Sequence, residues 1–306
     1  MTDLERDAAL LQERFGRPGA VAFEVSPLGG VVAVLTAGDG KAVVALQGAQ
    51  VLSWVPQHGE PDVLWCSPLS RLGTGKPVRG GIPICWPWFG PHSDAQAGHP
   101  AHGFVRAAMW AVEEIDSGDS TASVTLRRAL TPAQQQAVGG DVRANLRVAL
   151  GKDFEIGLTT ANSGQSPMIL TGALHSYFAV GDIGAVSISG LEGRSYLDQL
   201  TGREASQTGT LEITGETDQI YWDTSKDILI RDDRLRRVIT VESTGSDSTV
   251  VWNPWRDKSA RLGDMPPDSY RQMVCVETAN VGPRNTVTIV PGASHDMTCR
   301  ITCIKN

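Results

Sequence analysis

Beyond about residue 20, hydrophobic and polar positions alternate with a period of two. Strand-length runs of this kind are VVAVLTA (31–37), AVVALQ (42–47), VLSWV (51–55) and SVTLRRAL (123–130). NLRVAL and FEIGLTT flank Gly151, Lys152 and Asp153, which predicts a hairpin. Further candidates are VSISGL, TLEIT, DILIRD, RVITVEST, TVVWNP, TVTIVPG and MTCRITCI. The pattern predicts more than fifteen strands.

Helical spacing is confined to two short segments. The first follows the start of the chain, where Thr2 and Glu5 fit a capping box. The second begins near Thr131 and ends before Gly139. Because long helices do not separate the strands, a parallel βαβ fold is disfavoured. We expect one all-β domain over residues 1–306, a large antiparallel β-sandwich with residues 1–18 as an N-terminal helix extension.

The amino-acid composition and net charge limit the classes of protein to which this chain could belong. Of the 306 residues, 41% are hydrophobic and 20% charged, which predicts a large core. The net charge of −7 argues against nucleic acid or an anionic membrane as the main partner. The charged N-terminus is unlike a signal peptide, and no run of 18 apolar residues occurs. The odd number of cysteines, without a CxxC pair, predicts free thiols in a reducing cytoplasm.

The alternation breaks down in KPVRGGIPICWPWFGPH (76–92), whose prolines and glycines exclude a helix or an ordinary strand. A phosphate-binding P-loop reading of the preceding GTGK fails, because Ser70 stands where a glycine is needed and Pro77 follows the lysine. From the residues alone, Lys76 and Arg79 are best interpreted as solvated surface charges.

Two groups of histidines lie in loops. His102 begins HGFVR, which could bring its imidazole and the Arg106 guanidinium to one pocket, or His102 could simply bind backbone. The residues leave both interpretations open. His92, Asp94, His99 and His102 could form a metal cluster, but their spacing matches no regular site.

His175 and Glu277 lie in apolar, strand-like surroundings, TGALHSYFAV and MVCVETANV. A lone histidine in such a strand is more often a satisfied core residue than a catalyst. A buried glutamate destabilises a fold unless it is paired or functional, so Glu277 is a candidate for a pocket wall. A second carboxylate, as a glycosidase requires, could come from Asp198. Nucleophilic catalysis has little support, because GxSxG is absent.

Five motifs together carry a family resemblance. In chain order, KPVRGGIPICWPWFG, HGFVR, ALHSYF, YLDQL and MVCVETANV resemble the hexose-6-phosphate mutarotases, or glucose-6-phosphate 1-epimerases, over roughly residues 20 to 300. These form a branch of the aldose 1-epimerase (galactose mutarotase-like) superfamily. The resemblance implies the family's β-supersandwich with an open cleft. It also implies interconversion of sugar anomers through the open-chain aldehyde, without a metal or organic cofactor.

The resemblance also implies roles. His175 would be the general acid and Glu277 the general base, facing each other across a sugar-sized gap, and we expect the carboxylate to raise the pKa of His175. His102 would orient the sugar, Asp198 would hold its hydroxyls, and Arg106 would brace the pocket.

A phosphate clamp is the feature that distinguishes this branch. Lys76 and Arg79 would grip the phosphate, with Arg71 assisting. The aromatic candidates for the C–H side of the sugar are Trp86, Trp88 and Phe89. We therefore expect a cytoplasmic glucose-6-phosphate 1-epimerase, either a monomer or a weak homodimer, whose partner is a small sugar phosphate. The alternatives are an aldose 1-epimerase for unphosphorylated sugar and a non-catalytic sugar-phosphate binding protein.

Overall fold

The computed structural model describes residues 1–92, 98–224 and 227–305. Its helices are short: α1 (Asp3–Phe15), α2 (Pro132–Val138), α3 (Trp255–Arg261), and the 3₁₀ helices η2 (Ile183–Ala185) and η3 (Pro267–Gln272). Both predicted helices are confirmed, and capping boxes at Thr2 and Thr131 start α1 and α2. Helix α3 was not predicted. In the described parts of the chain, no helix is long and apolar enough to span a membrane.

In residues 1–92, 98–224 and 227–305, the strands form sheets of four, nine, eight and two strands. In the four-stranded sheet, the order is β1 (Val21–Val25), β2 (Val31–Ala37), β3 (Gly40–Ala45) and β4 (Val51–Val55). In the nine-stranded sheet, it is β16 (Leu211–Glu212), β13 (Val186–Ser189), β18 (Ile228–Asp232), β19 (Arg237–Thr244), β23 (Ser294–Lys305), β9 (Phe154–Asn162), β8 (Val142–Leu150), β7 (Thr121–Ala129) and β6 (Ala111–Gly118).

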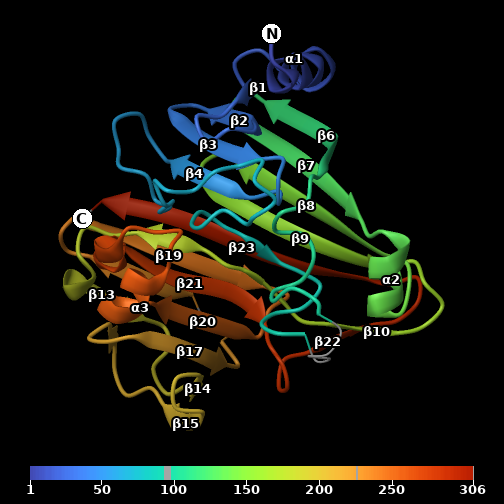
Figure 1. Ribbon diagram of the computed structural model, residues 1–306. Coiled ribbons are helices and arrows are strands. Elements are labelled where there is room, and N and C mark those ends of the chain that lie inside the picture. Colours follow the sequence, from blue (N-terminus) through green and yellow to red (C-terminus); the bar gives the residue numbers. More distant parts are fainter. Residues whose placement is uncertain (93–97, 225–226, 306) are drawn as a thin grey trace.

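The eight-stranded sheet carries the candidate site. Its order is β15 (Arg203–Ser206), β14 (Ser195–Asp198), β17 (Thr217–Trp222), β20 (Ser248–Asn253), β21 (Met273–Asn280), β11 (Gly172–Leu174) and β5 (Ile84–Cys85), while β12 (Tyr177–Ala179) also pairs with β21. The smallest sheet joins β10 (Met168–Leu170) to β22 (Val287–Ile289). Figure 1 shows α1 beside the four-stranded sheet at one end of the molecule and β14 and β15 at the other.

The prediction of an all-β antiparallel fold is confirmed, because the named strands pair antiparallel throughout and number 23 in the described residues. The hairpin at Gly151–Asp153 joins β8 to β9. Buried positions alternate with half-buried or exposed positions along these two strands. Their buried residues, among them Val148 and Ile156, contribute to the largest hydrophobic core.

Strand β21 lies between two apolar layers, and all eight of its residues are buried. Glu277 is opposite Val250 and Cys275 is opposite Trp252, so these four side chains share one face of the sheet. A small apolar cluster covers the same face and consists of Cys85, Ala173, Ile220, Trp222, Val250, Ala279 and Val281. The other face, with Val276, joins the main core.

The segment 76–92 is irregular, as predicted, apart from the two residues of β5. Two glycines in and near it allow close backbone approaches. A Cβ at Gly81 would lie 1.9 Å from the carbonyl oxygen of Val51, and one at Gly103 would lie 1.8 Å from that of Trp86. Only glycine fits there, which explains how the segment packs against β4 and against the His102 loop.

Candidate active site

The structure brings His175 and Glu277 together, although they are far apart in the sequence. Strands β11 and β12 both pair with β21, and His175 lies in the short kink between them. Its Nδ1 is 3.2 Å from Oε1 of Glu277, without the geometry of a hydrogen bond. The two side chains therefore touch, and the expected sugar-sized gap between them is absent. Among the described residues, Oε2 of Glu277 has no hydrogen-bond partner.

Burial dominates the proton affinities of this pair. Only 2% of the Glu277 side chain and 12% of the His175 side chain are exposed. Burial raises the pKa of Glu277 well above its usual value, and Asp218 adds to the rise while Arg106 opposes it. Burial lowers the pKa of His175 well below its usual value, and Arg106 adds to the fall. The expectation of a raised His175 pKa is therefore wrong, because desolvation and nearby cations outweigh the carboxylate.

These shifts favour a carboxylic acid beside a neutral imidazole. The alternative, a carboxylate beside an imidazolium, contains the same single proton. Moving this proton from one member of the pair to the other would interconvert the two forms without changing the net charge. The pair therefore keeps one proton at every pH between the lowered pKa of His175 and the raised pKa of Glu277.

We predict that Glu277→Gln stabilises the fold at alkaline pH. A folded-state pKa above the unfolded value gives stability that is present below pH 4.5 and is lost as pH rises through the folded pKa. Glutamine removes this loss, so the advantage of the mutant in unfolding free energy should grow from pH 5 upward, by at most about 1.4 kcal/mol per pH unit. Urea unfolding at several pH values measures it, with the exposed Glu114→Gln as control. An advantage that shrank with rising pH would contradict the raised pKa.

His102 lies beside this pair, with its ring centroid 6.3 Å from that of His175. Its φ of 63° is in the left-handed region. The Gly90 N–H donates to Nδ1 over 3.2 Å, so the ring proton of the neutral imidazole is on Nε2. Burial, with Arg106 and Arg79, lowers the pKa of His102 to about 4. His102 is thus a loop histidine bound to backbone and also a neutral N–H donor next to His175.

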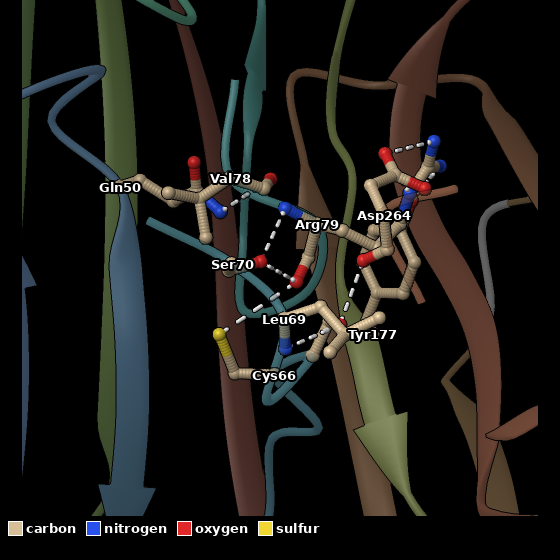
Figure 2. A network of polar contacts seen from close by, with 9 residues as sticks. Gln50, Cys66, Leu69, Ser70, Val78, Arg79, Tyr177 and Asp264 are labelled. Atoms are coloured by element: carbon tan, nitrogen blue, oxygen red, sulfur yellow. Dashed lines mark hydrogen bonds and ion pairs between the residues drawn. The ribbon is translucent and has the colours of Figure 1, made fainter. Parts of the chain in front are cut away.

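Arg79 enters the site from the segment before β5, and Figure 2 shows its contacts. Its Nε and Nη2 donate to one oxygen of Asp264, Oδ2, over 3.0 and 2.8 Å, and Nη1 donates to the Tyr177 hydroxyl over 3.1 Å. The Tyr177 ring stacks on the His175 ring, with centroids 4.7 Å apart and planes 8° apart. Arg79 is therefore linked to the catalytic candidate through a single side chain.

Arg106 is the second guanidinium near the pair. Its positive charge lowers the pKa of His102 and His175 and opposes the rise in that of Glu277. Its Nε is buried, and the described part of the chain provides no hydrogen-bond partner for it. Arg106 thus makes the local potential more positive.

The other two predicted clamp cations lie at the surface. Arg71 is exposed, and its Nη1 donates to the backbone oxygens of Pro68 and Ser70 over 3.0 and 2.6 Å. Lys76 is exposed as well, and its backbone oxygen accepts from Gln47. Neither residue is among the charges that shift the pKa of His175 or Glu277.

Asp198 lies at the end of β14, where its Oδ1 accepts from the Leu200 and Thr201 N–H groups over 2.8 and 3.2 Å. Its position opposite Gln219 puts it on the other face from Leu197. The carboxylate that acts on Glu277 is Asp218, which the sequence analysis did not single out.

Among the aromatic candidates, Phe89 lies nearest the site. Its ring is 5.0 Å from His102, and it packs against the apolar cluster on the Glu277 face. Trp88 packs instead against Phe104, with its indole N–H on Pro100. The expectation that Trp86 faces a sugar is wrong, because its side chain is fully buried in the main core.

Two residues that the analysis missed, Tyr177 and Trp252, contact His175 directly, the latter with ring centroids 6.3 Å apart. Tyr177 is two positions after His175 within the quoted ALHSYF motif, so alternation could have singled it out. Trp252 lies opposite Cys275 on the neighbouring strand, and a pairing between two strands cannot be predicted from a local sequence pattern.

Among the described residues, the potential metal ligands include two groups. In the first, ring centroids of His92 and His99 are 4.7 Å apart, and both rings pack on Trp88, while Asp94 lies outside the described residues. In the second, atoms of His175, Cys275 and Glu277 lie within 4.8 Å of one another. Burial raises the pKa of the Cys275 thiol and of Glu277, and two guanidinium groups lie nearby, so this donor set favours protons over a cation.

A family model described as Aldose 1-epimerase matches residues 32–302. The chain belongs to the aldose 1-epimerase family. A Salmonella typhimurium (strain LT2) protein provisionally named a glucose-6-phosphate 1-epimerase is 40% identical over 240 residues, 78% of this chain and 79% of that protein. The recognised family resemblance is thereby confirmed, and the protein is an isomerase.

Solved structures agree with this assignment. The crystal structure of YeaD from Salmonella typhimurium, provisionally described as a mutarotase, superimposes with a TM-score of 0.85 at 33% identity and covers 94% of both chains. A galactose mutarotase-like protein from Clostridium acetobutylicum, 14% identical, has a TM-score of 0.73 over 94% of this chain and 98% of that chain. The mutarotase-like fold of this aldose 1-epimerase family member is thus confirmed.

Proposed function

We propose that this aldose 1-epimerase family member interconverts the α and β anomers of a hexose 6-phosphate, with D-glucose 6-phosphate as its main substrate. The observation that carries the proposal is the one-proton pair of His175 and Glu277, linked through Tyr177 to the Arg79 guanidinium. The relative from Salmonella typhimurium that is provisionally named a glucose-6-phosphate 1-epimerase supports the choice of substrate.

The reaction requires one acid and one base. The step starts from the form of the pair that has an imidazolium and a carboxylate. His175 gives a proton to the ring oxygen as the C1–O bond breaks, and the Glu277 carboxylate takes the proton of the C1 hydroxyl as the aldehyde forms. The pair then holds its proton on the other member. The aldehyde then rotates about the C1–C2 bond. Ring closure runs the proton transfers in reverse, returns the proton of the pair to its first position and yields the other anomer. A pair that carries one proton over a wide pH range suits this exchange.

Because Nδ1 of His175 already faces Glu277, the sugar would lie over the pair rather than between its members. Its ring oxygen would meet Nε2 of His175. Its C1 hydroxyl would donate to the unpartnered Oε2 of Glu277, which is buried, so the side chains that cover this oxygen would have to move aside. That hydrogen bond favours the carboxylate form of Glu277 and so prepares it as the base.

Other groups would position the substrate. The His102 Nε2–H donates to the sugar near C1, whereas Asp198, on the opposite face of the sheet from Glu277, is not part of this binding mode. Phe89 and Trp88 wall the apolar side of the ring, and Arg106 braces the pocket. No metal or organic cofactor takes part.

The phosphate would bind at Arg79. Only a few covalent bonds separate the ring oxygen of a hexose 6-phosphate from its phosphorus, and a single side chain, Tyr177, separates Arg79 from His175. Lys76 and Arg71, both exposed, would add attraction at the entrance. We further propose a cytoplasmic protein that acts as a monomer or weak homodimer.

The deciding experiment compares anomerisation of glucose 6-phosphate and of glucose. We expect kcat/KM to be at least about tenfold higher for the phosphorylated sugar, because charge-assisted bonds to phosphate are absent with glucose. NMR exchange between the anomeric protons measures both rates. Equal efficiency would favour an aldose 1-epimerase for free sugars, and a rate equal to that in buffer would favour a non-catalytic binding protein.

A further inference from the structure

The Arg79 guanidinium already has an anionic partner within the protein. Asp264 receives two of its N–H groups on one oxygen, and Figure 2 shows both bonds. The two side chains differ in solvent contact, since 20% of the Arg79 side chain and 46% of the Asp264 side chain are exposed. A carboxylate on a half-exposed side chain thus occupies the position that we assign to the phosphate, and its second oxygen, Oδ1, is buried without a hydrogen-bond partner among the described residues.

The backbone around Asp264 is fixed, although its side chain is half exposed. Ser67 Oγ donates to the Asp264 backbone oxygen over 2.7 Å. The next residue, Met265, is buried in an apolar cluster with Tyr177 and Trp252. A change in the Asp264 side-chain rotamer alone would therefore release Arg79, without movement of the turn that carries it.

Arg79 is held independently of Asp264. Its Nη1 donates to Tyr177, and its backbone N–H and carbonyl both bind the Ser70 hydroxyl over 3.1 Å. If Asp264 turned away, the guanidinium would keep its place beside His175. Arg79, the more buried of the two, is thus held in place, whereas the Asp264 side chain can be replaced.

We propose that Asp264 is an internal substitute for the substrate phosphate, which displaces its carboxylate from Arg79 when a hexose 6-phosphate binds. This inference rests on the proposed function. A phosphate monoester carries nearly twice the charge of a carboxylate and offers three acceptor oxygens, so it replaces both bonds to Arg79. The displaced carboxylate enters water, which solvates it well. A sugar without phosphate has no group that competes for Arg79, so the pair of Arg79 and Asp264 stays intact when such a sugar binds.

The test uses orthophosphate as a probe of the anion site. Asp264→Asn keeps the shape of the side chain and removes the competing charge, so we expect it to bind orthophosphate about fivefold more tightly than the unaltered protein. We expect a similar fall in KM for glucose 6-phosphate. Isothermal titration measures the first and initial anomerisation rates measure the second. Asp264→Ser should change both in the same direction.

Asp268→Asn is the matched control, because it removes the same charge from an exposed position four residues along the chain and should leave both constants unchanged. In an Arg79→Ala background, Asp264→Asn should no longer tighten orthophosphate binding, because the exchange needs the guanidinium.

Weaker or unchanged orthophosphate binding by Asp264→Asn would overturn the inference and would make Asp264 a residue that orients Arg79. That outcome is separable from failure of the proposed function. If the unaltered protein anomerises glucose 6-phosphate but Asp264→Asn leaves its KM unchanged or raises it, only the exchange is wrong. If the unaltered protein has no anomerase activity, the proposed function fails, whatever the orthophosphate titrations give.

Discussion

Glu277→Gln should lower kcat for anomerisation of glucose 6-phosphate by about a hundredfold or more, because an amide cannot accept the C1 hydroxyl proton. Glutamine has the same shape as glutamate and, like the protonated carboxyl group, carries no charge, so the fold should persist. His175→Asn should cause a loss of similar size, because asparagine cannot deliver a proton to the ring oxygen. NMR exchange between the two anomers measures both rates, and circular dichroism checks the fold.

The two losses should not be additive. Each substitution breaks the same one-proton pair, so the double variant should be about as slow as either single variant. The exposed Glu114→Gln should retain the full rate. A near-normal rate in either single variant would assign its role to another residue, with Asp218 the first replacement for the base, since its charge already acts on Glu277.

The pH dependence of kcat/KM should be bell-shaped. On the acid side, the rate falls when the pair takes up a second proton at His175. This fall should occur at a pH below the ordinary pKa of histidine, because burial lowers the pKa of His175. On the alkaline side, the rate falls when the pair loses its remaining proton from Glu277. This fall should occur at a pH above the ordinary pKa of glutamate, because burial raises the pKa of Glu277. A rate that stayed constant from pH 5 to pH 9 and did not fall beyond either limit would contradict this acid–base pair.

Arg79→Ala should raise KM for glucose 6-phosphate by about tenfold or more, because it removes charge-assisted hydrogen bonds to the phosphate. The rate on glucose should change much less, since glucose has no phosphate to lose. Initial rates over a range of each sugar separate KM from kcat. The exposed Arg143→Ala removes a guanidinium far from the pair in the sequence and serves as the control.

An unchanged KM in Arg79→Ala would mean that the phosphate binds elsewhere in the protein. The alternative on structural grounds is Arg106, whose buried Nε has no partner among the described residues and whose charge acts on both members of the pair. Arg106→Ala would then show the rise in KM that Arg79→Ala lacks. Since the Arg106 charge also acts on the pKa of His175 and Glu277, the Arg106→Ala variant should show a shifted pH profile as well as a raised KM.

The sequence alone determined the class of fold and the main chemical candidates. Alternation identified strands such as β8, β9 and β23, because burial of one side of a strand imposes a period of two on the residues themselves. Capping residues likewise marked both ends of α2. Glu277 was recognisable because a buried carboxylate in an apolar strand needs a reason to be there, whereas His175 was singled out only by the family resemblance.

Only the tertiary structure decided how these candidates meet. The contact between His175 and Glu277, the opposite directions of their pKa shifts, and the pairing of Arg79 with Asp264 all join segments that are distant in the chain. Strands β14, β15 and β17 and helix α3 also escaped prediction, since their contacts with neighbours outweigh a weak local pattern. Desolvation and electrostatic attraction depend on distances in space, and a local pattern of residues contains no such distances.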